Sequence, residues 1–240
     1  MSQSYCRAVR SCCDVWRRYD RILEGTRFAF HEHEDHVEAT CPWGNRICCY
    51  EPQDRFGPVV LGMPVIECDV PSGSAEAITR FYREIIGARA IMADRDGLQA
   101  RIAVGIGQEL VFRETKSKLP AYDGHHIQVY VANFSRPHKR LLERNLITEE
   151  SNQYQYRFVD ITDLETGKPL FQIEHEVRCM THPLYARPLV NRNPRQTNRN
   201  YVQGRDGWVQ EWEDADMGDP RRAMRQRRYE EATGRPLAAD

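Results

Sequence analysis

The sequence lacks a long apolar run: no stretch of eighteen or more apolar residues occurs among its 240 residues. The opening Met-Ser-Gln-Ser-Tyr-Cys-Arg also lacks the apolar centre of a secretory signal. A transmembrane helix needs about 20 apolar residues, and a signal peptide needs a shorter apolar segment. We therefore expect a cytoplasmic protein with no membrane partner.

An excess of charge of one sign is also missing. The chain has 34 Lys and Arg against 35 Asp and Glu, which gives a formal net charge of −1. Proteins that bind nucleic acid usually gather basic charge on one surface, and the composition gives no sign of this. The sequence therefore predicts no nucleic-acid partner.

Spaced cysteine pairs are absent, although the chain contains 8 cysteines. No Cys-x-x-Cys motif occurs, and the adjacent pairs Cys12–Cys13 and Cys48–Cys49 cannot easily close a ring. A zinc knuckle and a disulfide framework are both poorly supported. We expect reduced thiols, which is typical of a protein in a reducing compartment.

What the sequence does contain is a repeated pattern. Residues 62–70 and 124–131 both alternate apolar and polar residues, which predicts a strand with one buried face. Each stretch is followed by a polar turn, an amphipathic helix and further strand-like segments. The interval from Gly62 to Gly124 is 62 residues, and a period of this kind indicates tandem duplicated units.

Two copies of this unit with an intact first strand lie at residues 62–115 and 124–178. Ser74 and Ser135 are predicted to cap their helices, and Gly87 and Asn145 are predicted to end them. The predicted strands are 63–70, 88–93, 98–104 and 109–114 in the earlier copy, and 124–131, 155–160 and 170–177 in the later one.

The two ends of the chain differ from this pattern. Residues 1–55 predict an incomplete unit, with a helix capped by Asp14 and strands at 27–30, 37–40 and 46–50. Its first-strand position, 4–11, shows little alternation, so we expect a unit truncated at its start. Residues 179–240 predict an extended C-terminal arm with Trp208 and Trp212, followed by a basic surface helix at 221–233.

Two segments resemble motifs of the vicinal oxygen chelate superfamily, which contains glyoxalase I, extradiol dioxygenases and the bleomycin- and fosfomycin-resistance proteins. Residues 77–87, Ala-Ile-Thr-Arg-Phe-Tyr-Arg-Glu-Ile-Ile-Gly, resemble its helix ending in Phe-Tyr-x-x-x-Leu-Gly. Residues 41–47, Cys-Pro-Trp-Gly-Asn-Arg-Ile, resemble its Asp-Pro-x-Gly-Asn turn. The resemblance covers about residues 12–178. It implies an α+β fold of tandem βαβββ modules, whose cupped mixed β-sheets are flanked by helices.

In that superfamily, a divalent metal is held by residues from the first and last strands of two paired modules. By this resemblance the metal ligands are Glu67, Glu109, His126 and Glu174. One imidazole and three carboxylates suit Fe, Mn, Ni, Co or Zn. Three alternatives stay open: Glu114 for Glu109, His125 for His126, and Glu176 for Glu174. In the first copy the corresponding last-strand position is Cys48, so we expect no metal there in the usual manner.

The resemblance implies a metal-dependent enzyme, with a glyoxalase-like lyase or isomerase favoured over a dioxygenase. Glu174 or Glu109 would act as the base on a small oxygen-rich substrate. The same strand faces carry the expected substrate-binding residues Arg113, Gln128, Tyr130 and Gln172. An extradiol-type dioxygenase, a metal-free resistance-type binding protein and a regulatory module plugged by the arm are the alternatives. The odd number of modules also suggests either an internal half-cup or a homodimer that completes the cup.

Overall fold

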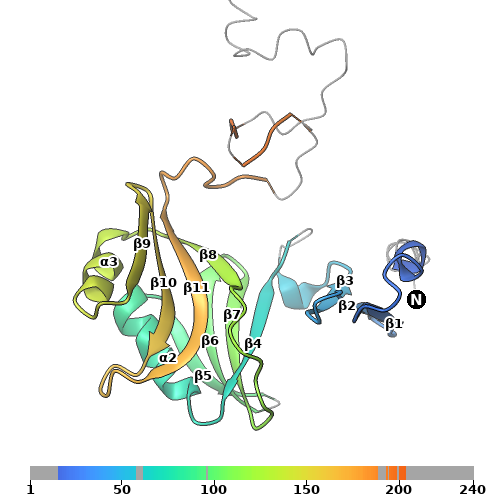
Figure 1. The fold of residues 1–240 in the computed structure, drawn as a ribbon, viewed down its shortest axis with the longest axis horizontal. Helices are drawn as coiled ribbons and strands as arrows, with labels where there is room; N and C mark the ends of the chain where they lie inside the picture. Colours follow the sequence, from blue (N-terminus) through green and yellow to red (C-terminus); the bar gives the residue numbers. More distant parts are fainter. Residues whose placement is uncertain are drawn as a thin grey trace, which may run out of the picture. The chain divides into compact units, whose positions relative to one another are not determined.

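The computed structural model describes residues 16–57, 62–95, 97–188, 193, 195–198 and 200–203. The chain divides into two units, Met1–Cys179 and Met180–Asp240, each considered by itself. The fold is α+β, with βαβββ-like modules and mixed sheets, which confirms the predicted fold class (Figure 1). The described helices include none that is long and apolar enough to cross a membrane. The predictions for 4–11, Asp14, Trp208, Trp212 and 221–233 lie outside the described residues.

The first sheet has three antiparallel strands in the order β1-β2-β3. Val37 and Ala39 on the middle strand are buried, whereas the residue between them, Glu38, faces the other side. Gly44, with a φ of 100°, allows the tight turn in which the amide of Cys41 donates to the carbonyl of Asn45. The strands are β1 (Ala29–Glu32), β2 (His36–Thr40) and β3 (Arg46–Tyr50), and a short helix η1 (Asp54–Phe56) follows.

The second sheet has the order β4-β7-β6-β5, and β4 runs parallel to β7. A helix separates β4 from β5, and its last turn widens into a π-helix that Gly87 ends with a φ of 80°. The elements are β4 (Val65–Pro71), α2 (Ala75–Phe81), η2 (Tyr82–Ile86), β5 (Ala90–Asp94), β6 (Leu98–Gly105) and β7 (Gln108–Thr115).

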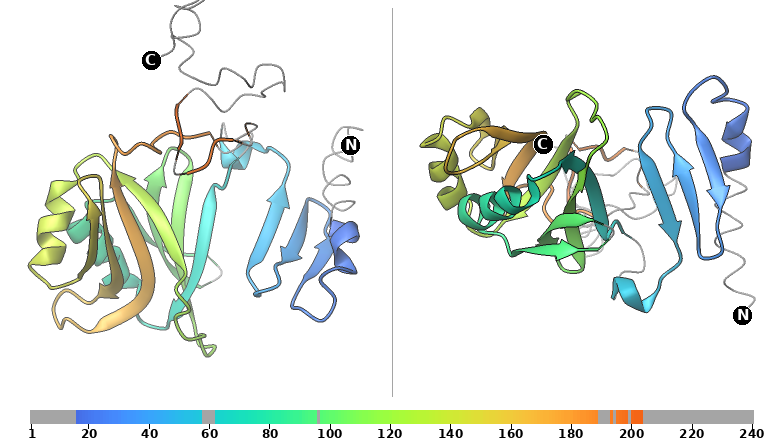
Figure 2. Two further views of the ribbon diagram at one scale, coloured as in Figure 1. Left: turned by 45° about the horizontal axis from the view of Figure 1, so that its top comes forward. Right: turned by 90° about the horizontal axis from the view of Figure 1, so that it is seen from below.

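The third sheet repeats this arrangement in the order β8-β11-β10-β9, with β8 parallel to β11. Figure 2 shows the two four-stranded sheets and their helices from two further directions. Strand β9 was not predicted, because after the partly buried Ile147 its Thr-Glu-Glu-Ser-Asn is exposed and shows no alternation. The elements are β8 (His126–Val131), α3 (Ser135–Leu142), β9 (Ile147–Asn152), β10 (Gln155–Thr162) and β11 (Pro169–Cys179).

The two helix starts differ from the prediction in their hydrogen bonds. Ser74 does precede α2, but its hydroxyl donates to the carbonyl of Pro71 rather than capping the helix. Ser135 lies inside α3, and the side chain of Asn133 accepts the amide of Arg136 instead. Asn145 has a φ of 55° just after α3, as predicted.

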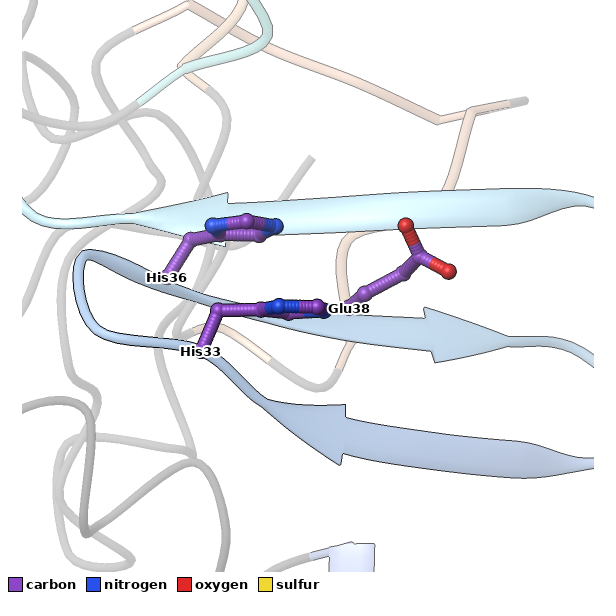
Figure 3. Close-up of side chains that lie close together, drawn as sticks. All are labelled: His33, His36 and Glu38. Carbon is purple, nitrogen blue, oxygen red and sulfur yellow. The ribbon is translucent and has the colours of Figure 1, made fainter.

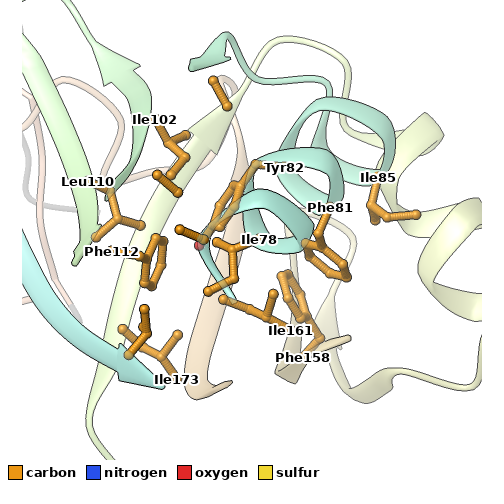
Figure 4. Packing of buried hydrophobic residues seen from close by; sticks show 14 of the residues in the cluster. Ile78, Phe81, Tyr82, Ile85, Ile102, Leu110, Phe112, Phe158, Ile161 and Ile173 are labelled. Atoms are coloured by element: carbon orange, nitrogen blue, oxygen red, sulfur yellow. The ribbon is translucent and has the colours of Figure 1, made fainter. Parts of the chain in front are cut away.

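The second and third modules share one hydrophobic core, with α2 between side chains of both sheets (Figure 4). On one side of α2, Ile78 and Tyr82 pack toward Phe112 of β7, and on the other Phe81 packs against Phe158 of β10 at 5.9 Å between ring centroids. Successive strand residues point to opposite faces, so the residues between the core residues point away from this core. The predicted site residues lie on those outer faces.

Candidate functional site

The outer face of the second module carries carboxylates that are each bound by arginine. The carboxylate of Glu67 on β4 lies 2.6 Å from the guanidinium of Arg113 on β7. Glu109, also on β7, pairs with Arg101 of β6. The register places Glu67 opposite Val111 and Glu109 opposite Val65, so the two carboxylates lie on neighbouring strands, offset by two residues.

The outer face of the third module brings His126 and Glu174 together. The two residues are direct register partners on the parallel strands β8 and β11, so their side chains leave the same face of the sheet. The carboxylate of Glu174 accepts a hydrogen bond from Arg157 at 2.8 Å. Arg157 also donates to Glu176 at 2.6 Å, and one guanidinium therefore bridges two acidic residues of β11.

A buried network centred on Arg178 continues along this face. Its guanidinium donates to Glu176 at 2.7 Å, Gln155 at 2.6 Å and Gln128 at 2.8 Å, and lies 3.4 Å from the Tyr130 hydroxyl. Arg178 is 7% exposed and Glu176 only 5% exposed. A buried ion pair is stable only when further hydrogen bonds satisfy both partners, which these contacts provide.

The expected substrate-binding residues are thus all held by side chains of the same chain. Gln128 and Tyr130 contact Arg178, and Arg113 contacts Glu67 and Asp69. The amide of Gln172 donates to Asp160 at 3.0 Å. These contacts fix the side chains in place, so the outer faces are pre-organised polar surfaces.

The three alternative ligand residues lie in different surroundings. Glu114 points toward α2, where its carboxylate accepts the amide of Ala75 at 2.9 Å, so Glu114 caps a helix. His125 precedes β8 and pairs with Asp123 at 2.7 Å. Glu176 belongs to the buried arginine network described above. Glu109, His126 and Glu174 remain on the outer faces.

A metal does not fit the predicted quartet within a single chain. Glu67 and Glu109 lie on one sheet and His126 and Glu174 on the other, and the shared core separates the two outer faces. Each of the three carboxylates is also in contact with a guanidinium. No three of these residues are among the ligand-type groups that lie close together in the described part of the chain.

One His/Glu group in the described residues does have the proximity that a metal ion needs. His33, His36 and Glu38 each offer a ligand atom, and these atoms lie within 4.8 Å of one another. All three belong to the first sheet, outside the predicted ligand set. The sequence signal was present in the histidine-rich run His31-Glu-His-Glu-Asp-His36, which precedes Glu38.

His175 is a further ionisable residue near the site, but it faces the core. Its ring stacks on Phe158 at 4.1 Å and is completely buried. The ring Nδ1–H donates to the carbonyl of Ile173, so Nε2 accepts the hydroxyl hydrogen of Tyr82 at 2.6 Å. Burial lowers the pKa of His175 to about 3, and the imidazole is therefore neutral.

Comparison with known proteins gives matches among solved structures. No family model and no curated protein matches the sequence. A glyoxalase family protein from Bacillus anthracis has a TM-score of 0.35 and 21% identity over 50% of this chain and 96% of that one. Lactoylglutathione lyase from Agrobacterium tumefaciens has a TM-score of 0.34 and 15% identity, covering 51% and 95%.

A third match is the fosfomycin-resistance protein FosX from Listeria monocytogenes, solved with Mn(II) and 1S,2S-dihydroxypropylphosphonic acid. Its TM-score is 0.36 at 14% identity, covering 50% of this chain and 93% of FosX. The chain's structural matches include a glyoxylase/bleomycin resistance protein/dioxygenase domain as well as these glyoxalase and fosfomycin-resistance proteins.

Proposed function

We propose that this protein binds a small, oxygen-rich molecule in a cup that two copies of the chain form together. The observation that carries the proposal is the shared core. Because both sheets bury their helix-facing sides against it, the two polar faces of one chain point away from each other. A cup needs two such faces turned toward one another, and a second copy would supply the missing half.

In this homodimer the outer face of β4 and β7 from one copy would meet the outer face of β8 and β11 from the other. The face of β4 carries Val65, an apolar side chain that is 42% exposed and lies opposite Glu109. Arg113, Gln128, Tyr130 and Gln172 would then line the enclosed space and orient the ligand.

The first candidate activity is that of a divalent-metal-dependent lyase or isomerase of the glyoxalase kind. Across two copies, Glu67 and Glu109 of one chain would face His126 and Glu174 of the other. The register pairing of His126 with Glu174 supports this assignment, because it places an imidazole and a carboxylate on one face. An extradiol-type site has less support: among the described residues on the outer faces of β4, β7, β8 and β11, His126 is the one histidine.

The second candidate is a metal-free binding protein, and the arginines favour it. Glu67, Glu109 and Glu174 are each neutralised by a guanidinium, so no cation is needed to stabilise them. A metal would have to displace Arg113, Arg101 and Arg157 from these carboxylates. Released guanidinium groups, in turn, would suit an anionic ligand such as a phosphonate or carboxylate.

Complementation between two variants tests the shared cup. One variant carries Glu67→Gln, and the other carries His126→Ala. Each alone should lose the tight Mn(II) sites, because every cup then lacks one ligand. After mixing and subunit exchange, half of the dimers are mixed and each regains one intact cup, so on the order of a quarter of the wild-type sites should return.

The oligomeric state provides the control. Sedimentation should show a dimer for the wild type, a monomer for Val65→Arg, and a dimer for Ile106→Arg, whose side chain is 92% exposed at the β6–β7 hairpin. A monomeric wild type would overturn the shared cup. A dimer that binds no Mn(II) would remove the lyase or isomerase candidate and leave the metal-free one.

A further inference from the structure

One face of the first sheet gathers ligand-type side chains from β2, from β3 and from the turn before β2. Val37 and Ala39 point into the buried side of β2, so His36 and Glu38 leave from the opposite face. Cross-strand partners share a face, and the register places Cys48 of β3 directly opposite Glu38. His33 lies in the turn before β2, where its amide donates to the carbonyl of His36 at 2.9 Å.

The ligand atoms are close to the spacing that a tetrahedral ion requires. His33, His36 and Glu38 have ligand atoms within 4.8 Å of one another, and Figure 3 shows both rings and the carboxylate on the same side of the hairpin. With bonds of about 2.1 Å, neighbouring ligand atoms around Zn²⁺ are about 3.4 Å apart. Closure by up to about 1.4 Å is needed, together with rotation of the His33 ring out of its 7° stack on His36, so that both in-plane lone pairs point at one ion.

His36 is already oriented by its surroundings. Its Nδ1 lies 2.7 Å from the carboxylate of Asp35, which in turn accepts a hydrogen bond from Arg55 at 3.1 Å. The His36 ring is stacked between His33, at 4.4 Å and 7° between planes, and Tyr50 at 4.7 Å. A carboxylate on one ring nitrogen leaves Nε2 with its lone pair available, which is the usual arrangement around a metal-bound histidine.

The thiol of Cys48 lies beside one of these three groups, the carboxylate of Glu38, and outside the set whose ligand atoms are all within 4.8 Å of one another. The Sγ of Cys48 is 4.0 Å from a carboxylate oxygen of Glu38, and about 3.5 Å separates sulfur and oxygen ligands on one zinc ion. Two imidazoles, a carboxylate and a thiolate form a closed four-coordinate set of the kind found in structural sites. Thiolate and imidazole together favour Zn²⁺ over the harder Mg²⁺ and Mn²⁺.

We propose that His33, His36, Glu38 and Cys48 form a zinc site that joins the β1–β2 turn to β3. The ion would link side chains from the turn, the middle strand and the third strand of this small sheet. It differs from the proposed cup in ligand chemistry, in metal preference and in the strands that supply the ligands. An ion that binds the folded sheet but not the unfolded chain would raise the free energy of unfolding, and tighter binding would raise it more.

Cobalt substitution in the full chain, produced without a histidine tag, tests the site. Titration with Co²⁺ should give one equivalent with the strong visible absorption of a tetrahedral ion and a thiolate-to-cobalt charge-transfer band. Cys48→Ser should abolish the charge-transfer band, while His33→Ala and His36→Ala should remove the tight site. Asp35→Ala, which removes only the orienting carboxylate, should weaken Zn²⁺ binding about 10- to 100-fold.

Two control variants distinguish metal binding at the proposed zinc site from metal binding at the cup. His138→Ala removes a histidine that pairs with Glu150 in the third module, and it should leave the cobalt spectrum unchanged. His126→Ala should lose Mn(II) binding at the cup but keep the cobalt spectrum. Equal Co²⁺ spectra from the wild type and a folded His33→Ala/His36→Ala variant would overturn the zinc site, and so would a wild-type spectrum without the charge-transfer band.

Discussion

At the scale of single residues, the face of a strand on which a side chain lies decides its surroundings. His175 and the two acidic residues next to it show the contrast. Glu174 and Glu176 face the outer surface and are held by Arg157, whereas His175, between them, turns into the core. Three consecutive ionisable residues therefore have two different environments, because alternate strand residues face opposite ways.

The buried imidazole should make stability depend on pH. The pKa of His175 is near 6.5 in the unfolded chain and about 3 in the folded protein, because burial disfavours the charged form. Below pH 6.5 the unfolded chain therefore binds a proton that the folded protein does not. The free energy of unfolding should fall by about 1.4 kcal/mol per pH unit from this group as the pH decreases toward 3.

Urea denaturation at pH 7 and pH 5 measures the effect. From pH 7 to pH 5, the wild type should lose about 2 kcal/mol more than His175→Gln, which has no titrating ring. Tyr82→Phe removes the donor to Nε2 but keeps the imidazole, and it should retain the pH dependence. Equal losses in the wild type and His175→Gln would show that His175 titrates normally in the folded protein.

At the scale of elements, the start of α2 is stabilised by a residue from a distant strand. Glu114 on β7 accepts the amide of Ala75, while Ser74 at the N-cap position makes no cap bond with its side chain. The first amides of a helix lack partners within the helix and carry a partial positive charge. A carboxylate 39 residues later in the sequence satisfies one of them.

Glu114→Ala should therefore destabilise the protein by about 1 kcal/mol, the usual value for loss of a helix cap. Glu114→Gln should cost less, because the amide oxygen can still accept the hydrogen bond. Glu84→Ala is the matched control, since Glu84 is exposed on the following π-helix turn. Midpoints of urea unfolding for the three variants measure the difference, and an unchanged midpoint for Glu114→Ala would contradict the cap.

At the scale of the whole molecule, the common core should make the second and third modules one cooperative unit. Phe81 is fully buried on α2, and its ring contacts Phe158 of the other module. Removing a buried Phe side chain typically costs about 3–5 kcal/mol. The loss of stability in Phe81→Ala should therefore also destabilise the strands of the third sheet.

Hydrogen exchange measures this coupling. In Phe81→Ala the amides of β10 should exchange faster, to an extent that matches the global loss of stability. Ile106→Ala, at an exposed hairpin, should leave the same amides unchanged. Separate unfolding transitions for the two modules, or protection of β10 that Phe81→Ala does not alter, would contradict a shared core.

Local patterns were sufficient for much of the fold. The ends of the predicted strands fall within two residues of those observed, because alternation and turn residues act over a few positions. Where a contact comes from far along the chain, local patterns were not sufficient. The cap of α2 by Glu114 and the strand β9 are examples. The residues next to each in the sequence show no pattern that predicts it.

Periodicity along the chain specified the order of strands and helices and the strand face that carries each expected site residue, and the family resemblance implied the α+β class. Which arginine binds each carboxylate, and which sheets bury their faces together, became clear from the packing of the folded chain. That packing also decided that His33, His36 and Glu38 meet at the first hairpin. Those outcomes depend on how elements pack across the molecule, which periodicity along a strand does not specify.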